Sequence, residues 1–146
     1  MHHNQKVKKI IGLIGENEIC QEVSAFLVKN GFYVTSISNK VSEIARYLIK
    51  LQEDEITDGL ITQIRNKGYQ VNKLYWINLV LTSVPENKNL IVIEDLRIED
   101  VIKDIIMPYY FTKNDDENNY PKDIKMIVKP NDSNEFKRML EKEFKR

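Results

Sequence analysis

The sequence predicts a single α/β domain, built as a three-layer parallel sheet with helices on both faces. Short apolar runs alternate with segments whose apolar residues recur at helical spacing, which is typical of repeated strand–helix units. The length of 146 residues suits one domain, and 42% hydrophobic with 30% charged residues suits a packed core under a solvated surface. We expect that domain to span residues 7–146, after a flexible polar tail at 1–6.

The first strand is expected at residues 7–14, an apolar run that is interrupted only by Gly12. A helix should follow at 18–30, where one apolar stripe recurs at helical spacing and Asn30 precedes a glycine stop. The single cysteine, Cys20, lies in this helix and cannot form an internal disulfide. Its spacing favours a small buried residue over a nucleophile.

The next segments predict a strand and then a helix. Residues 32–38 are rich in aromatic and β-branched side chains, which favours a strand. Amphipathic spacing over 41–49 predicts the helix, and Ser38 or Asn39 is its expected cap.

Two further helices are expected before the next strand. Apolar spacing over 56–68 predicts the first, which should close near Gly68. Residues 71–83 are apolar all round, as in a buried helix. Tyr75 and Trp76 lie in this segment, where core packing is a commoner role than stacking on a nucleotide base.

The last third of the chain begins with an uninterrupted apolar run at 90–93, which predicts a central parallel strand. Glu94 and Asp95 follow it; they are candidates to bind a metal or, more commonly in such positions, to cap the next helix. Helical spacing over 101–106 predicts that helix, with Pro108 as its stop. The elements expected after it are a short strand at 109–112, a surface loop at 113–121, a strand at 124–128 and a helix at 133–144 capped by Ser133.

Charge and hydropathy exclude several classes of protein. Lys plus Arg and Asp plus Glu each number 22, so the net charge is zero, which argues against a dedicated binder of nucleic acid or anionic membranes. The chain start is too polar for a signal peptide, and no apolar run approaches the length of a membrane span. We therefore expect a cytoplasmic protein without a membrane partner.

The connection between the first strand and its helix stands where a phosphate-binding loop would lie. Such a loop needs glycines that let backbone N–H groups curl round the phosphates, a lysine that neutralises them and a hydroxyl that holds magnesium. Residues 15–22 contain no lysine, no second glycine and no Ser or Thr, but they carry Glu16, Glu18 and Glu22. We expect these carboxylates to satisfy the helix dipole and to repel a triphosphate.

Four stretches in order along the chain resemble the P-loop superfamily of nucleoside monophosphate kinases. Within it, the resemblance is to phage-type deoxynucleoside monophosphate kinases and to dephospho-coenzyme A kinases. The stretches are residues 12–34, residues 36–46, the pair 73–77 and 90–97, and residues 131–136. The resemblance implies a nucleotide-kinase-like fold over nearly the whole chain.

The chain departs from the family pattern at three places. The positions of the family's lysine and hydroxyl residue fall at Cys20 and Gln21. The family's aspartate after the second strand appears as Asn39, and its basic lid corresponds to residues 98–122, which contain no arginine. Because phosphoryl transfer depends on positioning and charge stabilisation, these losses predict that no catalytic residue remains.

The residues that the resemblance assigns to nucleotide binding are Gly12, Gly15, Arg65, Asp95 and Arg97. Each arginine could instead be a solvated charge or part of a structural ion pair. Arg46 is a further candidate to which the same alternative applies. No metal ligand is assigned.

These observations leave three hypotheses for the function of the protein. The first is a degenerate nucleotide-kinase-like protein without cofactor, which binds a protein partner or holds a nucleotide weakly. The second is an active deoxynucleoside monophosphate kinase that uses ATP and Mg²⁺, with Lys9 or Lys40 as an unusual cation donor. The third is an unrelated α/β interaction module, because one fold hosts many functions. A homo-oligomer is compatible with each.

Overall fold

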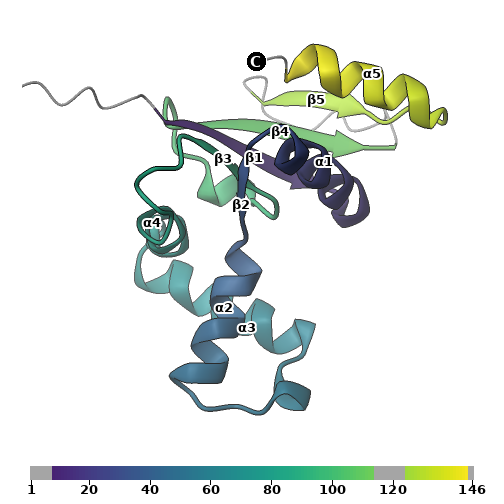
Figure 1. Cartoon of the computed structure of the whole chain (residues 1–146). Coiled ribbons are helices and arrows are strands. Elements are labelled where there is room, and N and C mark those ends of the chain that lie inside the picture. The colour runs from purple at the N-terminus through teal and green to yellow at the C-terminus, as the bar shows by residue number, and fades with distance from the viewer. Residues whose placement is uncertain (1–7, 114–123, 145–146) are drawn as a thin grey trace, which may run out of the picture.

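A computed structural model describes residues 8–113 and 124–144; the expected tail at 1–6 and nearly all of the expected loop at 113–121 lie outside these ranges. The described residues form an α/β fold in which helices cover both faces of one parallel sheet (Figure 1). The predicted class and the covered parallel sheet are therefore confirmed.

The described strands form a five-stranded sheet in the order β2-β3-β1-β4-β5, and every neighbouring pair is parallel. They are β1 (Lys9–Gly15), β2 (Tyr33–Thr35), β3 (Leu90–Ile93), β4 (Ile106–Thr112) and β5 (Lys125–Val128). β1 lies at the centre, where Ile11 is opposite Val92 of β3 and Met107 of β4. Since all pairs are parallel, the carboxyl ends of these strands meet at one edge of the sheet.

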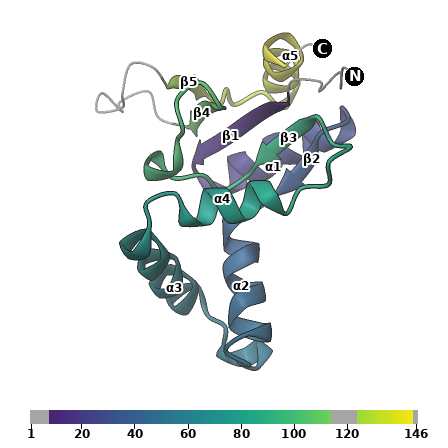
Figure 2. The same ribbon diagram turned by 90° about the vertical axis from the view of Figure 1, so that its left-hand side faces the viewer.

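The helices divide between the two faces of the sheet. The helices α1 (Asn17–Lys29) and α5 (Ser133–Glu143) cover one face, and α2 (Ile37–Tyr47), α3 (Asp58–Val71) and α4 (Tyr75–Thr82) lie toward the other (Figures 1 and 2). Side chains alternate along β1, so that Ile11 and Leu13 join the core under α1 and α5, whereas Ile10 and Ile14 join the core under α4. The sheet thus separates two apolar cores.

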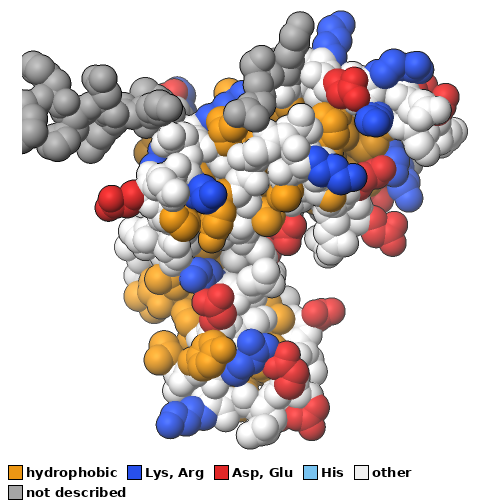
Figure 3. Space-filling model, in the orientation of Figure 1, with side chains coloured by type: hydrophobic (Ala, Val, Ile, Leu, Met, Phe, Trp, Pro, Cys, Tyr) orange, Lys and Arg blue, Asp and Glu red, His pale blue; other side chains and the backbone are white. Residues whose placement is uncertain are grey.

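The surface agrees with the zero net charge. On the face shown in Figure 3, basic and acidic side chains are intermixed, and apolar side chains also reach the surface over the helices below the sheet. Leu48 and Val71 are among the most exposed apolar side chains of those helices and their ends. No large area of that face carries one sign of charge.

The predicted helix at 101–106 is wrong. A 3-10 helix at Ile98–Asp100 and a turn at 103–105 occupy this region, and β4 already begins at Ile106. Asp104 has a φ of 69°, which a right-handed helix does not allow. Val101 and Ile102 pack from this irregular segment against the core under α4. Periodicity over so short a segment does not distinguish a helix from a buried loop.

Pro108, which was expected to stop that helix, lies inside β4 opposite Gly12. Proline has no N–H for the strand ladder and is normally confined to edge strands. β5 pairs with β4 only from Tyr109 onward, so within the described residues Pro108 has a paired neighbouring strand on one side only. The residue is tolerated here for the same reason as on an edge strand.

The helix caps lie before the predicted positions. β2 ends at Thr35, and Ser36 rather than Ser38 or Asn39 caps α2, because its hydroxyl accepts a hydrogen bond of 3.2 Å from the Asn39 backbone N–H. The cap of α5 is Asp132, one residue before the predicted position. α2 therefore begins close to the carboxyl edge of the sheet.

Gly68 lies inside α3 rather than at its predicted end, and its role is in packing. α3 continues to Val71, and a Cβ atom at Gly68 would overlap the indole of Trp76. The indole Nε1 donates a hydrogen bond of 2.7 Å to the carbonyl oxygen of Arg65. Trp76 is 2% exposed, so its predicted place in the core is confirmed. The contact between α3 and α4 therefore requires a residue without a side chain at position 68.

Candidate functional site

A polar hollow of about 250 Å³ opens at the carboxyl edge of the sheet, between the ends of β1 and β3. After β1 the chain crosses to β2 at one edge of the sheet, and after β3 it crosses in the opposite direction to β4. Ligands of open parallel sheets bind at such a switch point, which makes this edge hollow the candidate site. Its lining residues are Leu13, Gly15, Asn17, Cys20, Ser38, Arg65, Glu94, Asp95, Leu96 and Arg97.

The connection from β1 to α1 is a single residue, Glu16. Gly15 permits this turn because its φ is +124° and because a Cβ atom there would overlap the carbonyl oxygen of Phe111 in β4. The backbone N–H of Glu16 donates a hydrogen bond of 3.2 Å to that same oxygen. A loop that wraps phosphate needs several successive N–H groups, and this turn is too short to provide them.

The three glutamates around this turn have different partners. The carboxylate of Glu16 accepts a hydrogen bond of 3.3 Å from the Thr112 hydroxyl and one of 2.8 Å from the backbone N–H of the residue after Thr112. Glu22 forms an ion pair of 2.6 Å with Lys129. Glu18 remains in the first turn of α1, and no side chain of the described residues caps that helix. Of the three, Glu18 alone lies in the first turn of α1, so the expected compensation of the helix dipole stays a prediction for that residue.

The carboxylate of Asp95 caps the N-terminus of α2. Its Oδ1 accepts a hydrogen bond from the Ile37 backbone N–H, and its Oδ2 accepts from the Ser38 backbone N–H and the Ser36 hydroxyl, each at 2.8 Å. These charge-assisted bonds satisfy donors that a helix start leaves unpaired. The sequence predicted that Glu94 and Asp95 cap the next helix. That prediction is wrong, since Asp95 caps a helix much earlier in the chain.

Arg65 lines the hollow, but the chain's own acidic groups bind it. Its side chain is buried; Nη2 donates hydrogen bonds of 2.9 Å to Asp100 and to the carbonyl oxygen of Asp95, and Nε donates one of 2.8 Å to the Tyr69 hydroxyl. Burial works against the charged guanidinium. The Tyr69 hydrogen bond and the charges of Asp95 and Asp100 outweigh it and hold the pKa of Arg65 above its ordinary value. Little of this charge is left for a ligand.

Asp100, which no pattern in the sequence singled out, organises this buried network. Its Oδ2 accepts hydrogen bonds from Arg65, from the Tyr69 hydroxyl at 3.0 Å and from the Arg97 backbone N–H at 2.9 Å. Burial raises the pKa of Tyr69 to about 12, so that its hydroxyl stays a donor. Asp100 belongs to an acidic surface-like stretch of the sequence, so local pattern gave no sign that it is fully buried.

Arg97 is the cation that stays available at the mouth of the hollow. Its Nη1 donates a hydrogen bond of 3.1 Å to Asn66 Oδ1, and its guanidinium lies over the Tyr69 ring at 5.8 Å. No carboxylate within the described ranges forms an ion pair with it. The structure thus brings the predicted residues Gly15, Arg65, Asp95 and Arg97 together.

Glu94 and Cys20 form the wall of the hollow near α1. Burial raises the pKa of Glu94; the hydrogen bond with Ser24 opposes that rise and the Asp95 charge adds to it. Burial, with the nearby acidic groups, raises the pKa of Cys20 to about 12. A thiol with this pKa is not a nucleophile at neutral pH. The buried, unreactive role predicted for Cys20 agrees with its 2% exposure.

Two other candidates lie outside the hollow. Gly12 is in the middle of β1, where a Cβ atom would overlap the Leu96 side chain, so the glycine makes room for core packing. Arg46 binds Glu53 through two guanidinium nitrogens at 2.6–2.9 Å and is a surface ion pair.

Neither of the two lysines considered as cation donors lines the edge hollow. Lys9 begins β1 and so lies about 20 Å along the strand from Gly15. Lys40 forms an ion pair of 3.1 Å with Glu43 on α2.

Within residues 8–113 and 124–144, no group of three or more His, Cys, Asp or Glu side chains is arranged to hold a metal ion. The helices in these ranges are too short or too polar for any of them to cross a membrane. The chain matches no protein-family model, and no curated protein matches it. The resemblance to nucleoside monophosphate kinases stays a prediction, and function has to be inferred from the edge hollow.

Proposed function

We propose that this protein is a degenerate nucleotide-kinase-like protein that binds a ligand or partner without transferring phosphoryl groups. The observation that carries the proposal is the one-residue turn at Glu16. Phosphoryl transfer depends on donors held around the phosphates, and a turn of this length presents neither a cradle of N–H groups nor a lysine.

The charges in the edge hollow support the same conclusion. Arg65 is bound by Asp95 and Asp100, while Glu94 adds a further acidic group to the lining. Arg97 is left as the one arginine of the lining without an acidic partner among the described residues. A triphosphate would meet more negative than available positive charge, which opposes its binding.

The size of the hollow favours a small, nearly neutral ligand. A volume of about 250 Å³ lies just below the usual range of small-molecule sites. Arg97 and the Ser38 hydroxyl offer donors, and the Glu94 carboxylate offers an acceptor. The nucleoside part of a nucleotide has hydroxyl and amide groups that match this set.

A panel of nucleosides, nucleoside monophosphates and triphosphates, each with and without Mg²⁺, tests the proposal by thermal shift and by a turnover assay. We expect no phosphate transfer from ATP to any monophosphate. A nucleoside or monophosphate should give a small rise in melting temperature, with no gain from Mg²⁺. Measured turnover, or an ordered triphosphate wrapped by the backbone at residues 15–19, would contradict the proposal.

Matched arginine variants locate the binding. Arg97→Ala should abolish a nucleoside-induced shift, whereas Arg46→Ala removes a distant surface arginine and should leave the shift intact. A shift that survives Arg97→Ala would place the ligand outside the edge hollow. If no compound changes the melting temperature, the nucleotide part of the proposal fails and the interaction-module alternative is favoured.

A further inference from the structure

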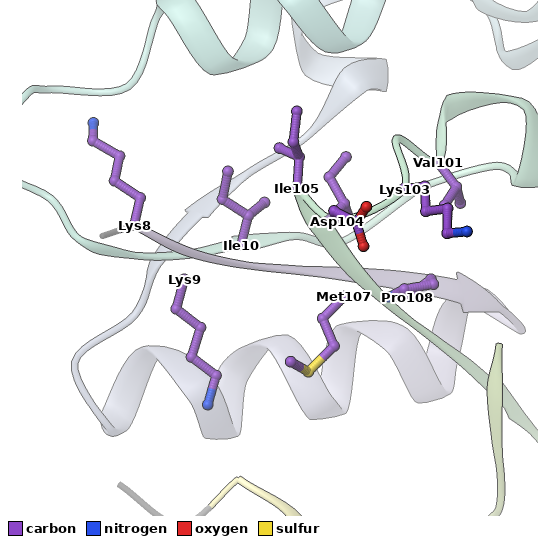
Figure 4. Close-up of a pocket in the computed structure, with 10 residues that line it drawn as sticks. Lys8, Lys9, Ile10, Val101, Lys103, Asp104, Ile105, Met107 and Pro108 are labelled. Carbon is purple, nitrogen blue, oxygen red and sulfur yellow. The ribbon is translucent and has the colours of Figure 1, made fainter. Parts of the chain in front are cut away.

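A second hollow lies at the opposite edge of the sheet, where β1 and β4 begin (Figure 4). We call it the amino-edge groove; its volume is about 550 Å³, within the range of small-molecule sites. Its floor contains Ile10 and Ile106, which are opposite each other in the ladder. Val101, Ile105 and the half-exposed Met107 extend this apolar surface.

The apolar wall of the groove is held in place by a closed turn. Ile105 is 51% exposed and points to the same side of the strands as Ile10 (Figure 4). The backbone N–H groups of Ile105 and Ile106 both donate to the carbonyl oxygen of Ile102, at 3.2 and 3.1 Å. A wall that is already ordered reduces the conformational entropy lost on binding.

Lysines surround this apolar surface. Lys8, Lys9 and Lys103 line the groove, and Asp104 is the one carboxylate among the lining residues. Lys8 lies on the side of Ile10, while Lys9 and Met107 lie on the other side of the strands, so the groove wraps the end of the sheet (Figure 4). None of the three lysines pairs with a carboxylate in the described part of the chain. The groove therefore combines apolar surface with excess positive charge.

We propose that the amino-edge groove binds a small amphipathic anion, with an apolar chain or ring over Ile10, Ile105 and Ile106 and an anionic head held by the rim lysines. Burial of the exposed apolar side chains supplies affinity, and the ammonium groups, which have no carboxylate partner among the described residues, select a negative head. A compact polyphosphate would leave the apolar floor uncovered, and a neutral apolar compound would leave the lysines unpaired. The proposal is independent of the function assigned to the edge hollow, because the groove lies at the other end of β1.

Titration calorimetry of the full chain with decanoate, below its micelle concentration, tests the proposal. Decanol carries the same chain without the charge, and acetate carries the charge without the chain. We expect saturable binding of decanoate, weaker binding of decanol and none of acetate. Absence of saturable decanoate binding would overturn the proposal, as would equal binding of decanol, which would show that the lysines play no part.

Two variants and two matched controls locate the bound probe. Ile105→Gln and Lys103→Glu should each weaken decanoate binding about tenfold, through lost apolar contact and through charge reversal at the rim. Leu48→Gln and Lys67→Glu make the same kinds of change at exposed positions of α2, α3 and their ends, and should leave the affinity within about twofold. Both target residues are exposed, so unchanged melting temperatures should show that the fold is intact. Decanoate affinity that the two groove variants leave unchanged would place the probe elsewhere and overturn the proposal.

Discussion

The N-termini of α1 and α2 lie at the same edge of the sheet, but the backbone N–H groups that each helix start leaves unpaired differ in their hydrogen-bond partners. At α2, Asp95 binds two backbone N–H groups and the Ser36 hydroxyl at 2.8 Å each. At α1, the adjacent carboxylate of Glu16 turns toward the end of β4, and the described residues provide no side-chain cap. One helix start is closed by the chain itself, and the other borders the edge hollow through Asn17.

The two helix starts at this edge therefore differ in role: the start of α2 is structural, and the start of α1 borders the candidate binding site. Asp95 lies 3.9 Å from Arg65 as well as at the start of α2, so it joins the end of β3 to two helices. Removing it should affect the stability of the whole fold. The start of α1 is connected to the end of β4 alone, through Glu16, so changes beside it should cost less stability than the loss of Asp95.

Asp95→Ala should give the largest effect. The variant removes the cap of α2 and leaves the buried Arg65 with one acidic partner fewer, and we expect a loss of about 3–5 kcal/mol in the free energy of unfolding. Denaturant unfolding measures it. Asp54→Ala removes an exposed aspartate and is the control, with an expected change within about 0.5 kcal/mol. A loss below about 1 kcal/mol for Asp95→Ala would remove the contrast between the two helix starts.

Gly15→Ala tests the tight turn before α1. The new Cβ atom would meet the Phe111 carbonyl oxygen at a residue with φ +124°, and we expect a loss of about 2–4 kcal/mol by the same measurement. Gly59→Ala is the matched control, because that glycine lies in α3 and a Cβ atom there would make only an ordinary contact with Thr57, at 3.9 Å. It should be neutral or stabilising by up to about 1 kcal/mol. Equal effects of the two variants would show that the turn tolerates a longer, less strained path.

The sequence predicted those parts of the structure that depend on local pattern. The apolar run at 90–93 and the stripe of α1 were found because neighbouring residues determine them. The bonds of Asp95 to α2 span 57–59 residues, so no local pattern could reveal that it caps this helix. Asp100 was missed for the same reason, since its burial depends on Arg65 in a distant helix. The absence of a lysine from residues 15–22 is a property of the sequence itself, and what it means for phosphate binding stays a prediction.

Glu16→Ala should have a smaller effect than either variant above. It removes the acceptor of two hydrogen bonds at the end of β4, one of them from the Thr112 hydroxyl, and we expect a loss of about 1–2 kcal/mol. Glu18→Ala changes an exposed glutamate in the first turn of α1, and its cost should stay below about 1 kcal/mol. A larger loss for Glu18→Ala would mean that the first-turn carboxylate, and not the bonds to β4, stabilises this end of α1.

Glu94→Gln should have the smallest effect, and its sign depends on pH. Burial, together with the Asp95 charge, raises the pKa of Glu94 in the folded chain, so the folded state binds this proton more tightly than the unfolded state does. The stability from that difference is present below the unfolded pKa and is lost as the pH rises through the folded pKa.

The uncharged glutamine should therefore raise the melting temperature relative to the natural chain at pH 7, by roughly 1–2 °C because the group is only half-buried. This difference in melting temperature should vanish as the pH falls below about 4, where Glu94 is protonated in both the folded and the unfolded natural chain. Glu99→Gln, at an exposed position, is the control and should show no gap that changes with pH. A difference in melting temperature that widens toward acid would mean that the folded chain favours the charged form of Glu94, which would contradict the prediction.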